Sequence, residues 1–145
     1  MATIQVKGLD EWLNKLQTLT DKSEGLCKRS VWEGGRVVGQ SISAALHDIP
    51  VQDEYVRKDE MRTGIRSEEK DDIIHGFGLS KMRNTGGKIS TQAGFKAGTK
   101  IRAVESGTSF MRKHPVVRPA VNRARAAAQA AMQSRFEEDI QNIMN

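Results

Sequence analysis

The sequence predicts a small α+β protein, with two N-terminal helices and a long C-terminal helix packed on an antiparallel sheet of three or four strands. Helical spacing of apolar residues occupies both ends of the chain, and strand-like alternation with glycine turns occupies residues 77–104. A length of 145 residues suits one domain over 1–145. Aromatic residues make up only 5% of the chain, so aliphatic side chains must form most of the core.

The chain begins with a predicted strand and helix. Residues 3–7 alternate polar and apolar side chains, which is typical of a short strand, and Gly8 ends it. From Leu9 to Leu19, apolar residues recur at steps of three and four. This spacing predicts an amphipathic helix with one buried stripe, and Trp12 is its largest side chain.

A second helix is predicted to run to about Leu46. Asp21 and Glu24 have the spacing of a capping box at its start, and Ile49-Pro50 ends it, because a residue before proline avoids the helical region. The glycines of 34–35 each cost about 1 kcal/mol relative to alanine in a helix. Either another backbone approaches closely there or the helix kinks. The predicted buried side consists of Leu26 or Cys27, Val31, Val38, Ile42 and Leu46.

Residues 51–72 lack apolar periodicity and are predicted to form a long mobile loop. Eight acidic and five basic residues lie between 52 and 72. We expect this segment to be ordered only on assembly, because it has no apolar stripe to dock it. A helical turn is expected at 72–76.

The predicted sheet follows. We predict one strand at residues 77–83 and the returning strand at 88–95. Residues 85–87 form the hairpin turn, because glycine tolerates the positive φ that such turns require. A turn at 97–98 leads into a further strand at 101–104. The last helix spans about 118–144, with Pro119 in its first turn. Its predicted apolar face consists of Val121, Ala124 or Arg125, Ala128, Met132, Phe136, Ile140 and Ile143.

The region between sheet and last helix carries the most distinctive pattern. Residues 105–109 read Glu-Ser-Gly-Thr-Ser, and 114–120 read His-Pro-Val-Val-Arg-Pro-Ala. Glu105 is the only acid in a basic region. We expect its carboxylate to accept N–H groups of the 107–109 turn or to pair with Arg118.

A Glu-x-Gly-Thr-Ser turn followed by His-Pro-x-x-Arg-Pro-Ala resembles the tail-component family of tailed phages that is named after a lambdoid phage's gene-ten product. The resemblance is most specific over residues 94–120. Its motif positions here are Glu105, Gly107, Thr108, Pro115, Arg118 and Pro119.

The resemblance implies a non-enzymatic virion protein of the phage or prophage neck, active in tail completion or head-to-tail joining. Such a protein assembles in the host cytoplasm into a ring, usually six-fold, between the head connector and the tail tube. The implied partners are further copies of the chain, the connector, stopper or portal-proximal proteins, and the tail tube or tail terminator. DNA would pass through the lumen of the ring.

Charge is distributed unevenly along the chain, whose net charge is +5. Between residues 81 and 125, eleven basic residues accompany one acid. This polarity suits contacts between acidic and basic edges of identical subunits. The alternative is a nucleic-acid-binding protein that uses the basic region without sequence preference, since no aromatic residues are interleaved for base stacking. The candidate subunit or DNA contacts are Glu68, Glu69, Lys96, Lys100, Arg102, Arg112 and Lys113.

We predict no catalytic residues, metal site or cofactor. The three histidines, at positions 47, 75 and 114, have no paired spacing, and residues 94–100 lack the pattern of a phosphate-binding loop. A metal-dependent nuclease is the third hypothesis, because Asp53 followed by Glu68-Glu69-Lys70 supplies acids and a lysine in the order such enzymes use. That chemistry needs a rigid strand, whereas this segment is irregular.

Cellular location is constrained by two further features. The single cysteine, Cys27, has no intrachain partner and fits a reducing cytoplasm, where we interpret it as a small packed side chain on a helix. No stretch approaches the roughly 20 apolar residues of a membrane span, and the first residues lack the pattern of a signal peptide. We therefore expect no membrane partner.

Overall fold

The computed structural model describes residues 8–145, so the strand expected at 3–7 lies outside the described residues. The class is α+β, as predicted: two N-terminal helices, short antiparallel strands and a long C-terminal helix. The elements are α1 (Leu9–Asp21), α2 (Ser23–Leu46), α3 (Ser67–Gly76), β1 (Phe77–Leu79), β2 (Arg83–Thr85), β3 (Lys88–Ser90), β4 (Ala93–Phe95), α4 (Gly98–Ser106) and α5 (Val117–Met144).

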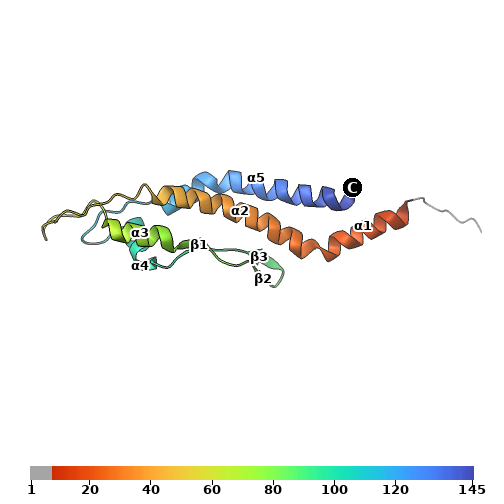
Figure 1. The fold of residues 1–145 in the computed structure, drawn as a ribbon, viewed down its shortest axis with the longest axis horizontal. Helices are drawn as coiled ribbons and strands as arrows, with labels where there is room; N and C mark the ends of the chain where they lie inside the picture. The colour runs from red at the N-terminus through yellow and green to blue at the C-terminus, as the bar shows by residue number, and fades with distance from the viewer. Residues whose placement is uncertain (1–7) are drawn as a thin grey trace, which may run out of the picture.

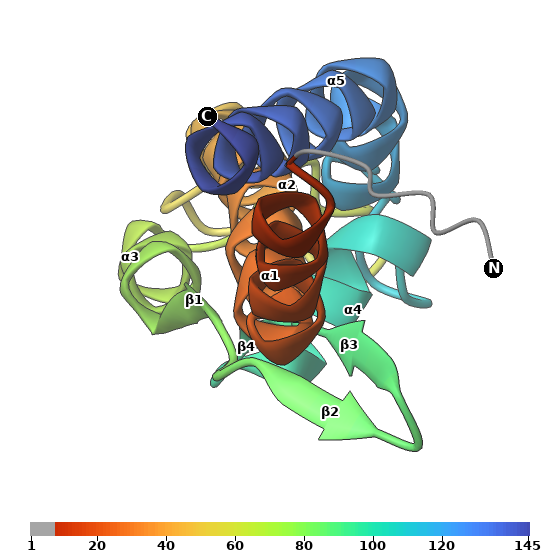
Figure 2. The same cartoon turned by 90° about the vertical axis from the view of Figure 1, so that its right-hand side faces the viewer.

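The long helices α2 and α5 lie side by side and form the spine of an elongated molecule (Figure 1). They run antiparallel: Ser41 Oγ donates to Ala120 O at 2.9 Å near one end, and Ser30 Oγ donates to Met132 O at 2.8 Å farther along. Viewed from the end, α5 lies on one side of α2, and the hairpin, α3 and α4 lie on the others (Figure 2). No helix within residues 8–145 has the length and hydropathy that crossing a bilayer requires.

Two glycines of α2 allow close approach on two sides, in agreement with the first interpretation of the 34–35 pair. A Cβ on Gly34 would lie 2.5 Å from Met132 Cγ and 3.4 Å from Ala128 O, both in α5. A Cβ on Gly35 would lie 2.9 Å from the Thr91 side chain, in the hairpin. The helix gives up intrinsic stability here so that both neighbours can pack against its backbone.

The strands form one interrupted hairpin. Phe77 pairs with Phe95 and Leu79 with Ala93, whereas Arg83 pairs with Ser90 and Thr85 with Lys88. Three residues, 80–82, oppose two residues, 91–92, so the register shifts by one and the predicted single sheet becomes two two-stranded sheets. Hydrogen bonds between the Ser80 and Thr91–Gln92 segments span the break.

The strand predicted at 101–104 is wrong, because these residues belong to helix α4. Ile101 and Val104 are three residues apart and both are buried in the core. Three-residue spacing places two side chains on one face of a helix, whereas a strand would turn them to opposite faces. Within the described residues, all four antiparallel strands therefore belong to the hairpin.

Helix α3 begins at Ser67, inside the segment predicted to be a loop. The two ends of the remaining part, 51–66, are hydrogen-bonded to each other. Gln52 N donates to Ile65 O at 2.7 Å, and Ile65 N donates to Pro50 O at 3.0 Å. Ile65 and Ile73 are both buried, at 4% and 0% exposure. The core therefore contains Ile65 of this segment and Ile73 of α3, together with Ile42, Ala45, Leu46, Ile49, Ile101, Val104, Met111, Val116 and Ala120.

Helix α1 departs most from its predicted packing. The sequence predicted one buried stripe, but α1 has no buried residue, and its largest side chain, Trp12, is 52% exposed. The capping box expected at the start of α2 is also absent, because Lys22 holds the N-cap position without a side-chain cap and Glu24 instead pairs with Lys28 at 2.7 Å. Because Lys22 alone separates the two helices, α1 continues beyond the spine and projects from one end of the molecule (Figure 1).

Candidate interaction surface

The motif residues form one structural unit, which we call the Glu105 corner (residues 105–119). Glu105 Oε1 accepts hydrogen bonds from the backbone N–H of Val116 at 2.5 Å and of Val117 at 2.7 Å, and Oε2 accepts from that of Arg118 at 3.4 Å. The first N–H groups of α5 have no partner within the helix, and no side chain of its own N-cap residue serves them. The carboxylate therefore caps α5 from the end of α4.

This capping corrects the partner that the sequence suggested for Glu105. The carboxylate binds neither the 107–109 turn nor the Arg118 guanidinium, and Arg118 contributes its backbone N–H. The local turn is closed by backbone bonds instead: Thr108 N donates to Met111 O at 2.9 Å, and His114 N donates to Val104 O at 2.7 Å. Pro119 lies in the first turn of α5, as predicted, and Pro115 is exposed just before it.

Gly107 ends α4 in a conformation that favours glycine. Its φ is +74°, and its N–H donates to Ala103 O at 2.8 Å. A Cβ at this position would lie 2.8 Å from Lys113 N and 3.1 Å from Met111 O, both backbone atoms. The chain can reverse here only with a residue that tolerates positive φ and has no side chain.

Charged side chains near the start of α3 form hydrogen bonds with nearby backbone groups. Asp53 Oδ1 accepts from Ser67 N at 2.8 Å, and this hydrogen bond lowers the pKa of Asp53. Glu69 Oε2 accepts from Arg66 N at 3.3 Å, and Lys70 Nζ donates to His47 O at 2.6 Å. Three of the four residues considered for a nuclease thus have backbone partners, and Glu68, Glu69 and Lys70 lie on a helix. Residues 8–145 contain no group of three or more acidic, histidine or cysteine side chains arranged to hold a metal ion.

The acidic and basic segments also meet within one chain. Lys100 Nζ on α4 lies 2.6 Å from Asp72 Oδ2 on α3, and this hydrogen bond raises the pKa of Lys100. Glu68 is exposed on the first turn of α3. Four of the other candidate contacts are exposed cations on α4 or on the segments flanking it: Lys96, Arg102, Arg112 and Lys113.

A hollow of about 280 Å³ lies between α3, α4 and the Glu105 corner. The cations Arg62 and Lys100 and the acid Glu69 line it, together with the apolar side chains Ile65, Ala103, Phe110 and Met111. Two predicted contact residues, Glu69 and Lys100, therefore share one concave surface. We call it the Phe110 hollow, because Phe110 is 72% exposed beside it.

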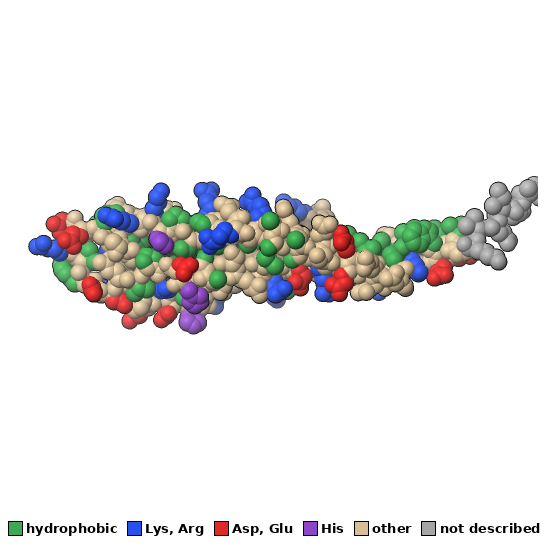
Figure 3. Space-filling model, turned by 90° about the horizontal axis from the view of Figure 1, so that it is seen from above, with side chains coloured by type: hydrophobic (Ala, Val, Ile, Leu, Met, Phe, Trp, Pro, Cys, Tyr) green, Lys and Arg blue, Asp and Glu red, His purple; other side chains and the backbone are tan. Residues whose placement is uncertain are grey.

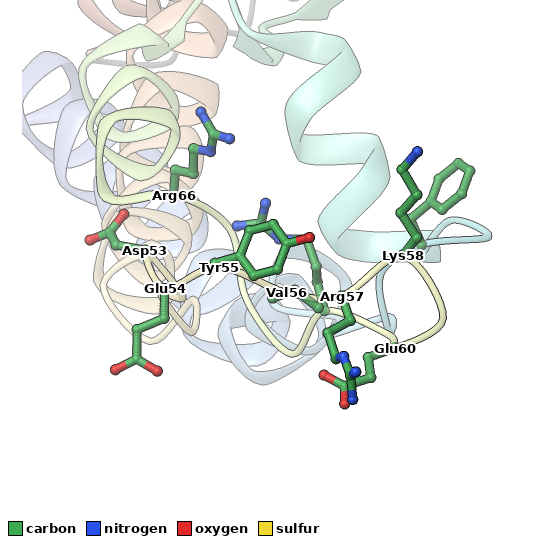
Figure 4. A pocket seen from close by; sticks show the side chains of 10 residues that line it. Asp53, Glu54, Tyr55, Val56, Arg57, Lys58, Glu60 and Arg66 are labelled. Carbon is green, nitrogen blue, oxygen red and sulfur yellow. The ribbon is translucent and has the colours of Figure 1, made fainter.

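A second hollow, of about 450 Å³, shares Arg62 and Phe110 with the first and extends along the 53–60 loop. Figure 4 shows Tyr55 between Asp53 and Glu54 on one side and Arg57, Lys58 and Glu60 on the other. Tyr55 is 88% exposed. Sequence reasoning missed Phe110, Tyr55 and Arg62, because isolated residues in an irregular segment have no periodicity that would reveal exposure.

Comparison of the chain with protein-family models, with curated proteins and with solved structures returned no match. The described residues form an elongated α+β molecule with a projecting amphipathic helix at one end and exposed aromatic side chains toward the other.

Proposed function

We propose that the protein is a non-enzymatic structural component of a phage neck, which completes the tail or joins it to the head. In this role, copies assemble into a six-fold ring between the head connector and the tail tube. The free subunit is made in the host cytoplasm and ends in the virion. DNA passes through the lumen without being read in sequence.

The observation that carries the proposal is the Glu105 corner. The resemblance to the phage tail-component family rests on residues 105–109 and 114–120, which are separated in the sequence. In the fold they make one unit, in which the acid caps the helix that begins at the second segment. The motif residues therefore act together at one turn of the fold, which supports the proposal.

Exposed apolar groups support the assembly part of the proposal. The large side chains Trp12, Tyr55 and Phe110 are between 52% and 88% exposed. Exposed aromatic residues are enriched at protein interfaces, where burial of their rings provides much of the binding energy.

Deletion of the gene from the phage or prophage tests this function directly. We expect particles that package DNA but carry no attached tails, with infectivity restored by the wild-type gene in trans. Electron microscopy of the lysate measures attachment, and the lengths of the unattached tails separate a joining role from a tail-terminating role. Infectious tailed particles from the deletion strain would contradict the proposal.

The nucleic-acid-binding alternative has its own measurement. Each phosphate neutralised by a cation adds about one unit to the slope of the logarithm of the binding constant against the logarithm of the salt concentration. Retention of DNA by the purified protein at physiological salt, falling steeply as salt rises, would favour that alternative if the deletion strain also made normal tails.

A further inference from the structure

Helix α1 carries an apolar stripe that residues 8–145 leave about half exposed. Leu9, Trp12, Leu13 and Leu16 are 46%, 52%, 52% and 39% exposed. These spacings place the four side chains on one face of the helix. Figure 3 shows hydrophobic side chains gathered along the projecting end of the molecule. A contiguous exposed apolar face of this kind marks a contact site in a soluble protein.

The other end of the molecule offers a matching surface, the Phe110 hollow. Apolar side chains of Ile65, Ala103 and Met111 form part of its lining, and Phe110 stands 72% exposed beside it. Its charged lining consists of two cations, Arg62 and Lys100, and one acid, Glu69. Helix α1 has the opposite balance, with three acids against one lysine.

We propose that α1 of one copy docks in the Phe110 hollow of the next copy, with Trp12 and Leu13 against Phe110 and the acids of α1 near Arg62 and Lys100. This inference deepens the proposed function, since it rests on assembly of identical subunits and names the surfaces that meet. Charge complementarity orients the helix, while apolar burial provides the attraction.

The placement of the two surfaces determines the type of assembly. Helix α1 projects from one end of the elongated molecule, and α3 and α4 lie toward the other (Figure 1). A contact between different surfaces leaves one free α1 and one free hollow on every pair, so it continues into a ring or a filament. Pairing of two α1 helices would instead close at a dimer, leave Phe110 uncovered and bring two acidic helices together.

Disulfide trapping tests this contact. In a Cys27→Ser background, Gln17→Cys places a thiol on exposed α1 surface and Thr99→Cys places one at the hollow. Mixed in equal amounts under mild oxidation, these two variants are expected to form the 17–99 cross-link at least about tenfold faster than a control mixture. The reason is that docking raises the effective thiol concentration from micromolar toward millimolar.

The control mixture replaces Thr99→Cys by Gln129→Cys, an exposed position on α5 outside the hollow. Cross-linking of Gln17→Cys with itself at an equal or higher rate would overturn the proposal in favour of α1 pairing. Rates equal to the control at concentrations where sedimentation shows assembly would also overturn it. Neither outcome bears on the deletion phenotype, which judges the proposed function separately.

Mixing of interface variants provides an independent readout. Leu13→Ser removes an apolar contact from the α1 surface, and Phe110→Ser removes one from the hollow. Each residue is more than half exposed, so both variants should keep the wild-type melting temperature. Each alone is expected to stay monomeric in sedimentation at concentrations where the wild type and an Asn14→Ser control assemble. Their mixture should stop at dimers, because only one productive contact remains. Assembly of Phe110→Ser alone like the wild type would refute the proposal.

Discussion

Glu105 holds the start of α5 with a side chain that comes from a different helix. Its carboxylate accepts hydrogen bonds from the N–H groups of Val116, Val117 and Arg118, so one residue connects the end of α4 to the start of α5. The charge of a carboxylate also suits the positive end of the α5 dipole. Capping from outside the helix could not be read from the local sequence, because Val116 is not a capping residue type.

Glu105→Ala should therefore destabilise the protein by about 1–3 kcal/mol, because it leaves the N–H groups of Val116 and Val117 without partners. Glu105→Gln keeps an acceptor oxygen and should lose less. Chemical denaturation of the three proteins measures the difference. Equal free energies of unfolding for Ala and wild type would show that the cap contributes nothing.

Gly107→Val should cost at least about 1–3 kcal/mol, because a β-branched residue is strained at positive φ and its Cβ would meet the Lys113 backbone at 2.8 Å. The matched control is Gly98→Ala at the start of α4, where an added Cβ meets nothing within 4 Å. Thermal melts should show a loss for the first variant and none for the second. An unchanged melting temperature for Gly107→Val would contradict the role of this turn.

Among the elements, the spine depends on small residues. Gly34→Ala places a Cβ 2.5 Å from Met132 Cγ, which forces that side chain or α5 to move. We expect a loss of about 1–3 kcal/mol from overpacking. Adding Met132→Ala removes the clash. The double variant should therefore lose less unfolding free energy than the sum of the losses in the two single variants. Strict additivity in the unfolding free energies would argue against direct contact.

An ion pair joins the N-terminal part of α2 to the C-terminal part of α5. Asp139 is 8% exposed on α5, and Arg29 Nε on α2 donates to its Oδ2 at 2.9 Å. Arg135 Nε also lies 3.4 Å from Oδ2. The hydrogen bond from Arg29 lowers the pKa of Asp139, and the charges of both arginines add to this effect.

The sign of this shift gives a pH prediction. Because the folded pKa lies below the unfolded value of about 4, the contribution is fully present above pH 4 and is lost as the pH falls through the folded pKa. Asp139→Asn should lower the free energy of unfolding at pH 7 by roughly 1–3 kcal/mol and show less acid sensitivity than wild type. Parallel stability curves of the two proteins between pH 7 and pH 2 would contradict this.

At the level of elements, the long helices and the hairpin could be predicted from the sequence, whereas the short helix α4 could not. The end of α2 and the start of α5 match the prediction because Pro50 and Pro119 mark them. Residues 100–104 fit strand alternation and three-residue helical spacing equally well, and the burial of both Ile101 and Val104 decides for the helix. The burial of Asp139 was not predictable either, because it depends on Arg29, which is 110 positions away.

For the whole molecule, we expect the 53–61 segment to be the first site of cleavage in the free protein. The predicted mobile region, 51–72, now narrows to this segment, because Ile65 is buried in the core and α3 begins at Ser67. Arg57 and Lys58 are exposed there and suit trypsin. Limited digestion with mass spectrometry should find cuts after these residues, with protection in the assembled form. Equal protection of free and assembled protein would contradict a disorder-to-order change.

The isolation of α1 also has a thermodynamic consequence. Helix α1 has 13 residues and no buried side chain, and isolated helices near this length, about 12–15 residues, are only marginally stable in water even for alanine-rich chains. Part of any binding energy must therefore be spent on keeping α1 helical, and affinity depends on helix propensity as well as on contacts. Substitutions such as Thr18→Ala on the side away from the stripe would then tighten assembly without touching the interface. Evolution could adjust the strength of the assembly through residues that no partner ever meets.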